Sequence, residues 1–153
     1  MRKLIVAAVL AAGLPLLAEA AELEGAGRFC GYAPIIDLLP GEKVTTLEGG
    51  FHSGTFLWEG PFGSLDVRGI GWASRPKGRM VEAQNGTKPA RFAQRRKGDR
   101  YEVAIWNGGH GAAYFSSDKP LNAHQLKAIS RVRLFEEGQD PSGCALRTRF
   151  SWE

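Results

Sequence analysis

The chain carries two cysteines, Cys30 and Cys144, which lie close to its two ends. Cysteines in an exported chain most often pair with each other, and the first twenty residues predict export. A bridge between the two closes a loop of more than 100 residues, which the chain-entropy description credits with roughly 4–5 kcal/mol of stability. The pairing predicts that the segment after the leader lies beside the last strand. The alternative is two free thiols.

The opening of the chain has the three parts of a secretory signal peptide. Arg2 and Lys3 give it a positive start, residues 4–17 are almost entirely apolar, and Ala18-Glu19-Ala20 places small residues at the cleavage positions. The apolar run spans about 21 Å as a helix, less than the roughly 30 Å of a bilayer core. We therefore expect cleavage, and a secreted or periplasmic mature chain over residues 21–153 without a transmembrane segment.

Removal of the signal peptide, residues 1–20, takes away two cations and one anion, so the net charge falls from +4 to +3. About 133 residues remain, which is enough for one domain with one core. A charge this small excludes a dedicated nucleic-acid binder. The two cysteines have no nearby histidine and make a poor metal-ligand set. The sequence indicates neither a metal nor a cofactor, and it leaves the oligomeric state open.

The mature sequence favours an all-β fold, because its 19 glycines separate short runs of alternating apolar and polar residues. We expect one domain of about seven to eight short strands, built as a sandwich or a small barrel. One short helix is predicted near residues 118–128, with Asn122 as its N-terminal cap. The two prolines in residues 31–50 predict a loop or one helical turn there.

The alternation of apolar and polar residues assigns side chains to one face or the other of several expected strands. In residues 51–58, Phe56 and Trp58 share a face, and in residues 65–73, Leu65 and Val67 face away from Asp66 and Arg68. The apolar phase of the latter strand changes after Gly69, which predicts a bulge or a bend. The remaining expected strands are 80–84 and 87–92, joined as a hairpin by Asn85-Gly86, then 100–106, 112–116, 130–136 and 145–152.

The most distinctive local feature is a basic segment over residues 75–100, which carries nine cations and two anions, a net +7. Such a lobe attracts an anionic partner such as lipid head groups, an acidic glycan or an acidic protein. The alternative is a solvated region whose charge protects a sheet edge. Of the four tryptophans, Trp106 stands at a strand end and is expected to be the most exposed. The ligand-binding residues that we predict are Arg91, Arg95, Arg96, Arg100 and Trp106.

A second basic feature depends on strand pairing. If residues 130–136 and 145–152 form a hairpin, four arginines share its outer face, where they repel one another unless acids or a ligand lie between them. These arginines are Arg131, Arg133, Arg147 and Arg149.

The function that these patterns favour is an exported, non-enzymatic binding module for an anionic or glycan-containing envelope component or for a protein partner. One alternative is a small hydrolase that uses His110, in a glycine-rich turn, with Asp66 or Glu102. Another is a secreted inhibitor that inserts a rigid loop, formed by residues 108–111 or 60–64, into a foreign enzyme. No nucleophile motif appears in the sequence.

Overall fold

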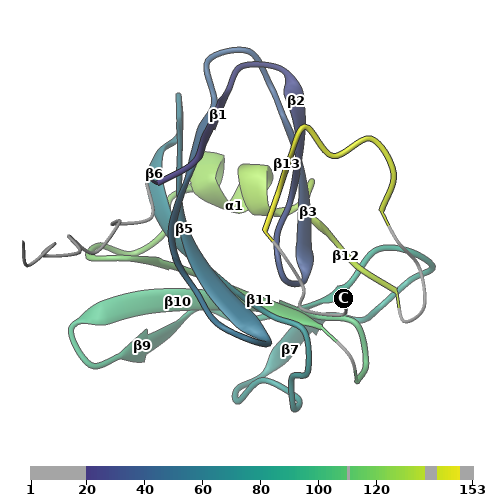
Figure 1. Ribbon diagram of the computed structural model, residues 1–153. Helices are drawn as coiled ribbons and strands as arrows, with labels where there is room; N and C mark the ends of the chain where they lie inside the picture. Colours follow the sequence, from purple (N-terminus) through teal and green to yellow (C-terminus); the bar gives the residue numbers. More distant parts are fainter. Residues whose placement is uncertain (1–19, 110, 137–140, 149–153) are drawn as a thin grey trace, which may run out of the picture.

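In the computed structural model, which describes residues 20–109, 111–136 and 141–148, two β-sheets and one short helix enclose the core (Figure 1). The sheets do not close on each other, so the molecule is a sandwich and not a barrel. The larger sheet contains nine strands, and its spatial order is β1-β4-β5-β6-β11-β10-β8-β7, with β9 also paired to β10. In chain order these strands are β1 (Glu22–Glu24), β4 (Lys43–Gly49), β5 (Ser53–Gly60), β6 (Gly63–Ile70), β7 (Met80–Glu82), β8 (Ala90–Phe92), β9 (Arg95–Lys97), β10 (Arg100–Trp106) and β11 (Ala112–Ser117).

The smaller sheet has four strands in the order β12-β3-β2-β13 and covers one face of the larger sheet. The described residues therefore hold thirteen strands, more than the seven or eight expected, because several contain only two or three residues. The elements are β2 (Gly27–Cys30), β3 (Pro34–Leu38), β12 (Arg133–Leu134), β13 (Leu146–Arg147) and the helix α1 (Ala123–Ile129).

The core lies between the two sheets and follows the predicted alternation. Phe56 and Trp58 of β5 are 1 % and 0 % exposed, and Leu65 and Val67 of β6 are equally buried. The helix begins as expected at Asn122, whose side chain accepts a hydrogen bond from the backbone N–H of Gln125 in a capping box. Other residues of the core are Phe29, Tyr32, Ile36, Leu38, Val44, Val103, Ile105, Phe115, Ala128 and Ile129.

The predicted phase change at Gly69 is wrong. Leu65, Val67 and Gly69 all face the core, and the register of β6 with both neighbours runs without a shift. A Cβ atom on Gly69 would lie 2.7 Å from Cδ of Pro34, so the glycine marks a close approach of the two sheets. Trp72, expected to share the apolar face after the change, is 53 % exposed.

The loop predicted for residues 31–50 is also wrong, because this stretch forms β3 and β4. Pro34 is the first residue of β3, a position where a missing N–H costs no ladder bond. Ile36 and Leu38 face the core while Asp37 is exposed. The flanking Ile35 and Leu39 are also apolar, and they obscure this alternation in the sequence.

The predicted hairpin between residues 130–136 and 145–152 does not form. β12 and β13 lie at opposite edges of the smaller sheet, where β12 pairs with β3 and β13 pairs with β2 in parallel. The four arginines are therefore not one row. Arg131 forms an ion pair with buried Glu42, and Arg133 pairs with Asp37. Arg149 lies outside the described residues.

The disulfide between Cys30 and Cys144 is confirmed, with Cα atoms 5.8 Å apart across a sequence separation of 114. It joins β2 to the residues just before β13, as the pairing of the two chain ends predicted. A disulfide is compatible with an oxidising compartment outside the cytoplasm. Within the described residues, no helix is both long and apolar enough to cross a membrane. All but the last residue of the predicted signal peptide lies outside those residues.

Asp37 on the outer face of the smaller sheet gives the fold an acid-sensitive contact. Its carboxylate accepts hydrogen bonds from Arg28 at 2.6 Å and from Arg133 at 2.9 Å. The hydrogen bond from Arg28 is the largest cause that lowers the pKa of Asp37 below its ordinary 3.8. A lowered pKa stabilises the fold above the pH at which the unfolded chain titrates, and this contribution is lost as the pH falls through the folded value.

We therefore expect the variant Asp37→Asn to be less stable than the parent chain at pH 6. The difference should shrink as the pH falls below about 4 and the parent loses its ion pairs. Urea unfolding of both proteins at pH 6 and pH 3 measures it. Half of the Asp37 side chain is exposed, so the effect is small. An equal difference at both pH values would contradict this expectation.

Candidate functional site

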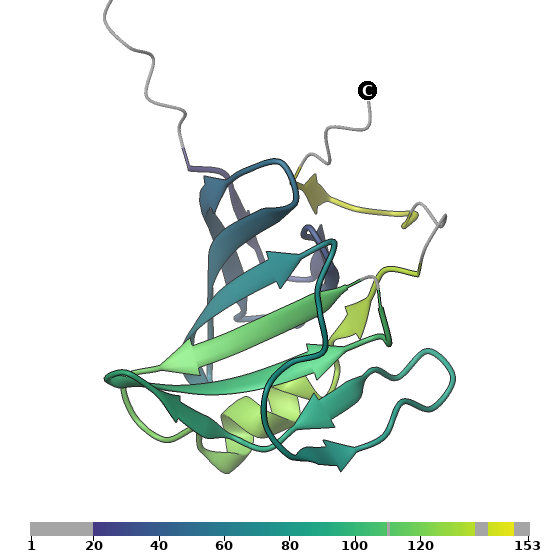
Figure 2. The same cartoon turned by 90° about the horizontal axis from the view of Figure 1, so that it is seen from below.

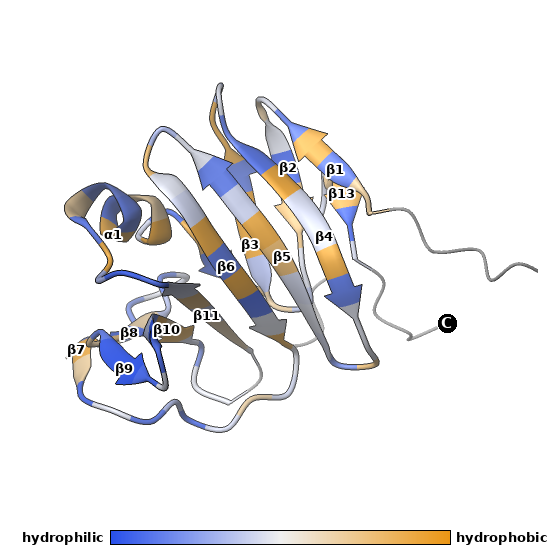
Figure 3. Cartoon of the chain, turned by 90° about the vertical axis from the view of Figure 1, so that its left-hand side faces the viewer, coloured by the Kyte–Doolittle hydropathy of each residue, from blue (hydrophilic) through white to orange (hydrophobic). Residues whose placement is uncertain are grey.

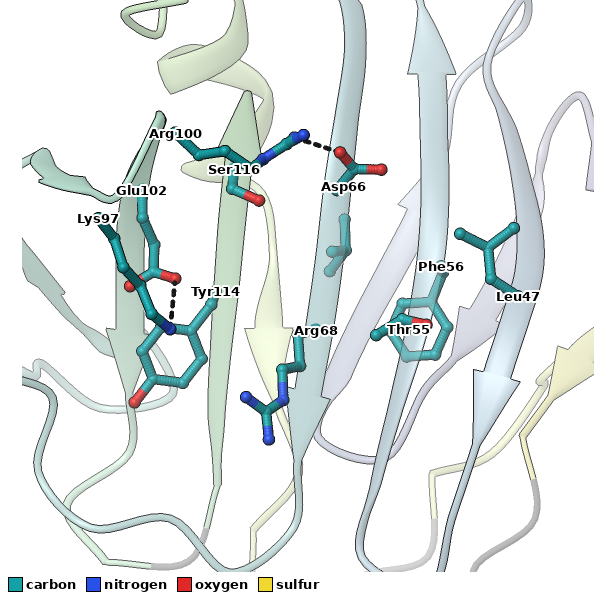
Figure 4. Close-up of a pocket in the computed structure, with 11 residues that line it drawn as sticks. Leu47, Thr55, Phe56, Asp66, Arg68, Lys97, Arg100, Glu102, Tyr114 and Ser116 are labelled. Atoms are coloured by element: carbon teal, nitrogen blue, oxygen red, sulfur yellow. Dashed lines mark hydrogen bonds and ion pairs between the residues drawn. The ribbon is translucent and has the colours of Figure 1, made fainter. Parts of the chain in front are cut away.

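The face of the larger sheet that points away from the core carries a groove, which is the candidate site (Figure 4). Its volume is about 430 Å³. Figure 3 looks onto the open face of β4, β5 and β6. The residues that line the groove come from β4, β5, β6, β9, β10 and β11, and they are Leu47, Thr55, Phe56, Asp66, Val67, Arg68, Lys97, Arg100, Glu102, Tyr114 and Ser116.

The register of the sheet explains why these side chains meet. Thr55 of β5 is the direct partner of Arg68 of β6, which is in turn the direct partner of Tyr114 of β11. Side chains of cross-strand partners lie on the same face at roughly 5 Å. Asp66 and Ser116 form the neighbouring pair on the same face. Apart from Phe56 and Val67, whose side chains belong to the core, the groove is thus lined by residues of the outward face of the sheet.

A segment that we call the strap, residues 71–79 between β6 and β7, crosses the same sheet without lining the groove. Figure 2 shows this segment crossing in front of the larger sheet, seen from below. Trp106 Nε1 donates a hydrogen bond to the backbone oxygen of Ala73 in the strap at 3.3 Å. The guanidinium of Arg75 lies 5.1 Å from the ring centre of Phe92. Trp106 and Phe92 pack with Tyr114 in a second apolar cluster, which closes this side of the face.

Charges inside the groove are paired, with one exception. Glu102 accepts from Arg95 at 2.7 Å and lies 3.7 Å from Lys97. Asp66 pairs with Arg100. Arg68 is exposed, and its side chain forms no ion pair or hydrogen bond with any residue that the structure describes. Its guanidinium extends into the groove between Tyr114 and Thr55 (Figure 4).

Tyr114 also lines the groove, and its hydroxyl points toward the β10 side, away from Arg68 (Figure 4). Burial is the main cause that raises the pKa of Tyr114 above its ordinary 10, and the neighbouring Glu102 carboxylate adds to it. The phenol is therefore protonated near neutral pH and is a hydrogen-bond donor. Together, Arg68 and Tyr114 present donors and a positive charge, with the hydroxyl groups of Thr55 and Ser116 nearby.

The ligand-binding residues that the sequence predicts do not lie in one place in the structure. Arg100 lines the groove and pairs with Asp66, whereas Arg95 does not line it but pairs with the groove residue Glu102. Arg91 pairs instead with Glu82 on β7, and Arg96 bonds the backbone oxygen of Gly98. The expectation that Trp106 is the most exposed tryptophan is wrong. It is half-buried in the second cluster, and the strap covers it.

The structure describes two of the three residues of the alternative catalytic set. Asp66 and Glu102 both line the groove, on strands separated by β11. Both carboxylates form ion pairs, Asp66 with Arg100 and Glu102 with Arg95 and Lys97. His110 lies outside the described residues. The described residues contain no cluster of three or more His, Cys, Asp and Glu side chains able to hold a metal ion.

Arg68 is the residue that the sequence did not single out. The alternation of β6 already placed it opposite Leu65 and Val67, on the same face as Asp66. What the sequence lacked was the register, which sets Arg100 beside Asp66 and leaves Arg68 unpaired. Comparison with protein-family models, curated proteins and solved structures found no match for this chain.

Proposed function

We propose that the chain is an exported, non-enzymatic binding module whose groove holds the anionic group of a ligand. The unpaired, exposed guanidinium of Arg68 in the middle of the groove carries this proposal. An arginine side chain without a counter-ion attracts a carboxylate or a phosphate group, which it can bind through two parallel hydrogen bonds.

The surroundings of Arg68 suit a small ligand. Tyr114 and Thr55 are its direct partners on either side, and the hydroxyl group of Thr55 can donate a further hydrogen bond to an anion. The volume of about 430 Å³ falls in the range of small-molecule sites. Leu47, which is 54 % exposed at the rim, offers an apolar contact. An anionic envelope component, including an acidic glycan, meets these requirements.

The non-enzymatic part of the proposal rests on the two groove carboxylates. Asp66 is bound by Arg100, and Glu102 by Arg95 and Lys97. A general acid or base must have an oxygen free to reach the substrate. These cations compete with any substrate for the same oxygens.

Substitution of Arg68 by glutamine tests the proposal. We expect benzoate and phenyl phosphate to bind the parent protein, and Arg68→Gln to weaken both by at least tenfold, about 1.4 kcal/mol, because a charged hydrogen-bond donor is lost. Two-dimensional NMR titration measures the affinity, and signals of Thr55 and Tyr114 should move in the parent protein.

The matched control is Arg96→Gln, which removes an exposed arginine that does not line the groove. It should leave both affinities unchanged. Benzyl alcohol, which lacks the anionic group, should not bind measurably. Equal binding of the alcohol, or equal affinity of the Arg68→Gln protein, would refute the role of Arg68.

A further inference from the structure

An exposed aromatic pair lies at one end of the larger sheet. Phe51, in the turn between β4 and β5, is 64 % exposed, and Trp72, at the start of the strap, is 53 % exposed. Their rings flank His52, at centroid distances of 4.2 Å and 6.5 Å. Large apolar side chains gathered on a surface are typical of interaction sites.

The strap continues this surface with positive charge. After Trp72 it carries Arg75, Lys77 and Arg79, all exposed, and it contains no acidic residue. Lys77 and Arg79 form no ion pair with any residue that the structure describes. Their charges are therefore free to meet an anionic partner.

The aromatic pair and the cations come from segments that lie next to one another. The β4–β5 turn, the end of β6 and the strap follow one another along the lower edge of the sheet in Figure 3. Seen from below in Figure 2, the strap is the nearest segment. We call this surface the basic edge, formed by Phe51, Trp72, Arg75, Lys77 and Arg79.

We propose that the basic edge docks the protein onto an anionic lipid surface, a role that goes beyond the ligand groove. Trp is enriched at membrane–water interfaces, where its ring sits at head-group level. Basic residues beside such rings are drawn to anionic head groups. Phe51 has no polar side-chain atom, so its exposed ring gains from an apolar environment and offers nothing to the hydroxyl groups of a sugar.

Vesicle flotation tests this docking. The purified protein is mixed with vesicles of phosphatidylcholine alone, or with equal parts of phosphatidylglycerol. Mass spectrometry of the N-terminus ensures that all variants are compared in the same processed form. We expect binding to the anionic vesicles, weakened by 0.5 M salt because it depends on charge. Phe51→Ser/Trp72→Ser and Lys77→Glu/Arg79→Glu should each reduce it at least tenfold.

The control is Leu39→Ser, since Leu39 is 49 % exposed but belongs to the β3–β4 turn. It should float like the parent, as should Arg68→Gln, so failure of docking and failure of the groove are told apart. Brominated lipid should quench tryptophan emission in the parent and not in Trp72→Phe. Equal binding to neutral vesicles, undiminished binding of either double variant, or capture of heparin in place of vesicles would overturn the proposal.

Discussion

Replacing both cysteines by alanine should lower the free energy of unfolding by roughly 4–5 kcal/mol. The bridge between Cys30 and Cys144 spans 114 residues, and a cross-link over so long a loop strongly restricts the unfolded ensemble. β13 pairs with β2 through only two residue pairs, so the hydrogen bonds of this ladder contribute little to the stability of the fold. Urea unfolding of the oxidised parent and the double variant measures the difference.

The reduced parent protein is the control, because it carries the same side chains without the bond. It should match the Cys30→Ala/Cys144→Ala variant to within about 1 kcal/mol, since only two small side chains then differ. A double variant as stable as the oxidised parent would show that the bridge does not restrain the unfolded chain.

Gly69→Val should destabilise the fold by about 3 kcal/mol, at the upper end of the cost of overpacking a core. A Cβ atom at this position meets Cδ of Pro34 at 2.7 Å and the backbone nitrogen of Ala33 at 3.3 Å. Neither group can turn aside, because one belongs to a ring and the other to the main chain. The two sheets must therefore separate locally. The midpoint of urea unfolding should fall accordingly.

Gly109→Val is the matched control, since a Cβ atom there has no neighbour within 4 Å and Gly109 does not have a positive φ. It should change stability by less than about 0.5 kcal/mol. If Gly69→Val changed stability as little as Gly109→Val, the sheets would be able to relax around the added side chain. The close approach would then not restrict position 69 to glycine.

The basic segment that dominated the sequence is partly neutralised in the fold, where five of its nine cations form ion pairs with described residues. Glu102, just beyond the segment, pairs with Arg95 and Lys97, and Asp66 of β6 pairs with Arg100. Among the described residues, Lys77 and Arg79 of the strap have no ion-pair partner. Net charge along a segment therefore overestimated the field that a partner meets, because strand pairing supplied counter-ions from elsewhere in the chain.

Local patterns predicted the parts of the fold that depend on neighbouring residues. The alternation of β5, the hairpin around Asn85-Gly86 and the cap at Asn122 are all confirmed. The hairpin turn centres on Gly86 and Thr87, with Gly86 at a φ of +57°. Errors arose where partners are distant. The apparent phase change at Gly69 reflected contact with Pro34, 35 positions earlier in the sequence.

The candidate site shows the same division. Alternation alone put Asp66 and Arg68 on one face, and the basic segment pointed toward Arg95 and Arg100. Which of these cations is left without a counter-ion depends on the register between β6, β10 and β11, which no local pattern encodes. The strap likewise covers Trp106 and exposes Trp72, a choice made by the path of the chain across the sheet.

The sequence by itself determined an all-β chain, a capped helix and a bond between its two cysteines, because alternation, capping and thiol pairing depend on residue type and spacing. Only the tertiary structure decided that two open sheets stack, that β12 and β13 lie at opposite edges, and that Arg68 stands unpaired in a groove. Cross-strand register and the distance between layers are set by packing of the whole core, and no short segment contains that information.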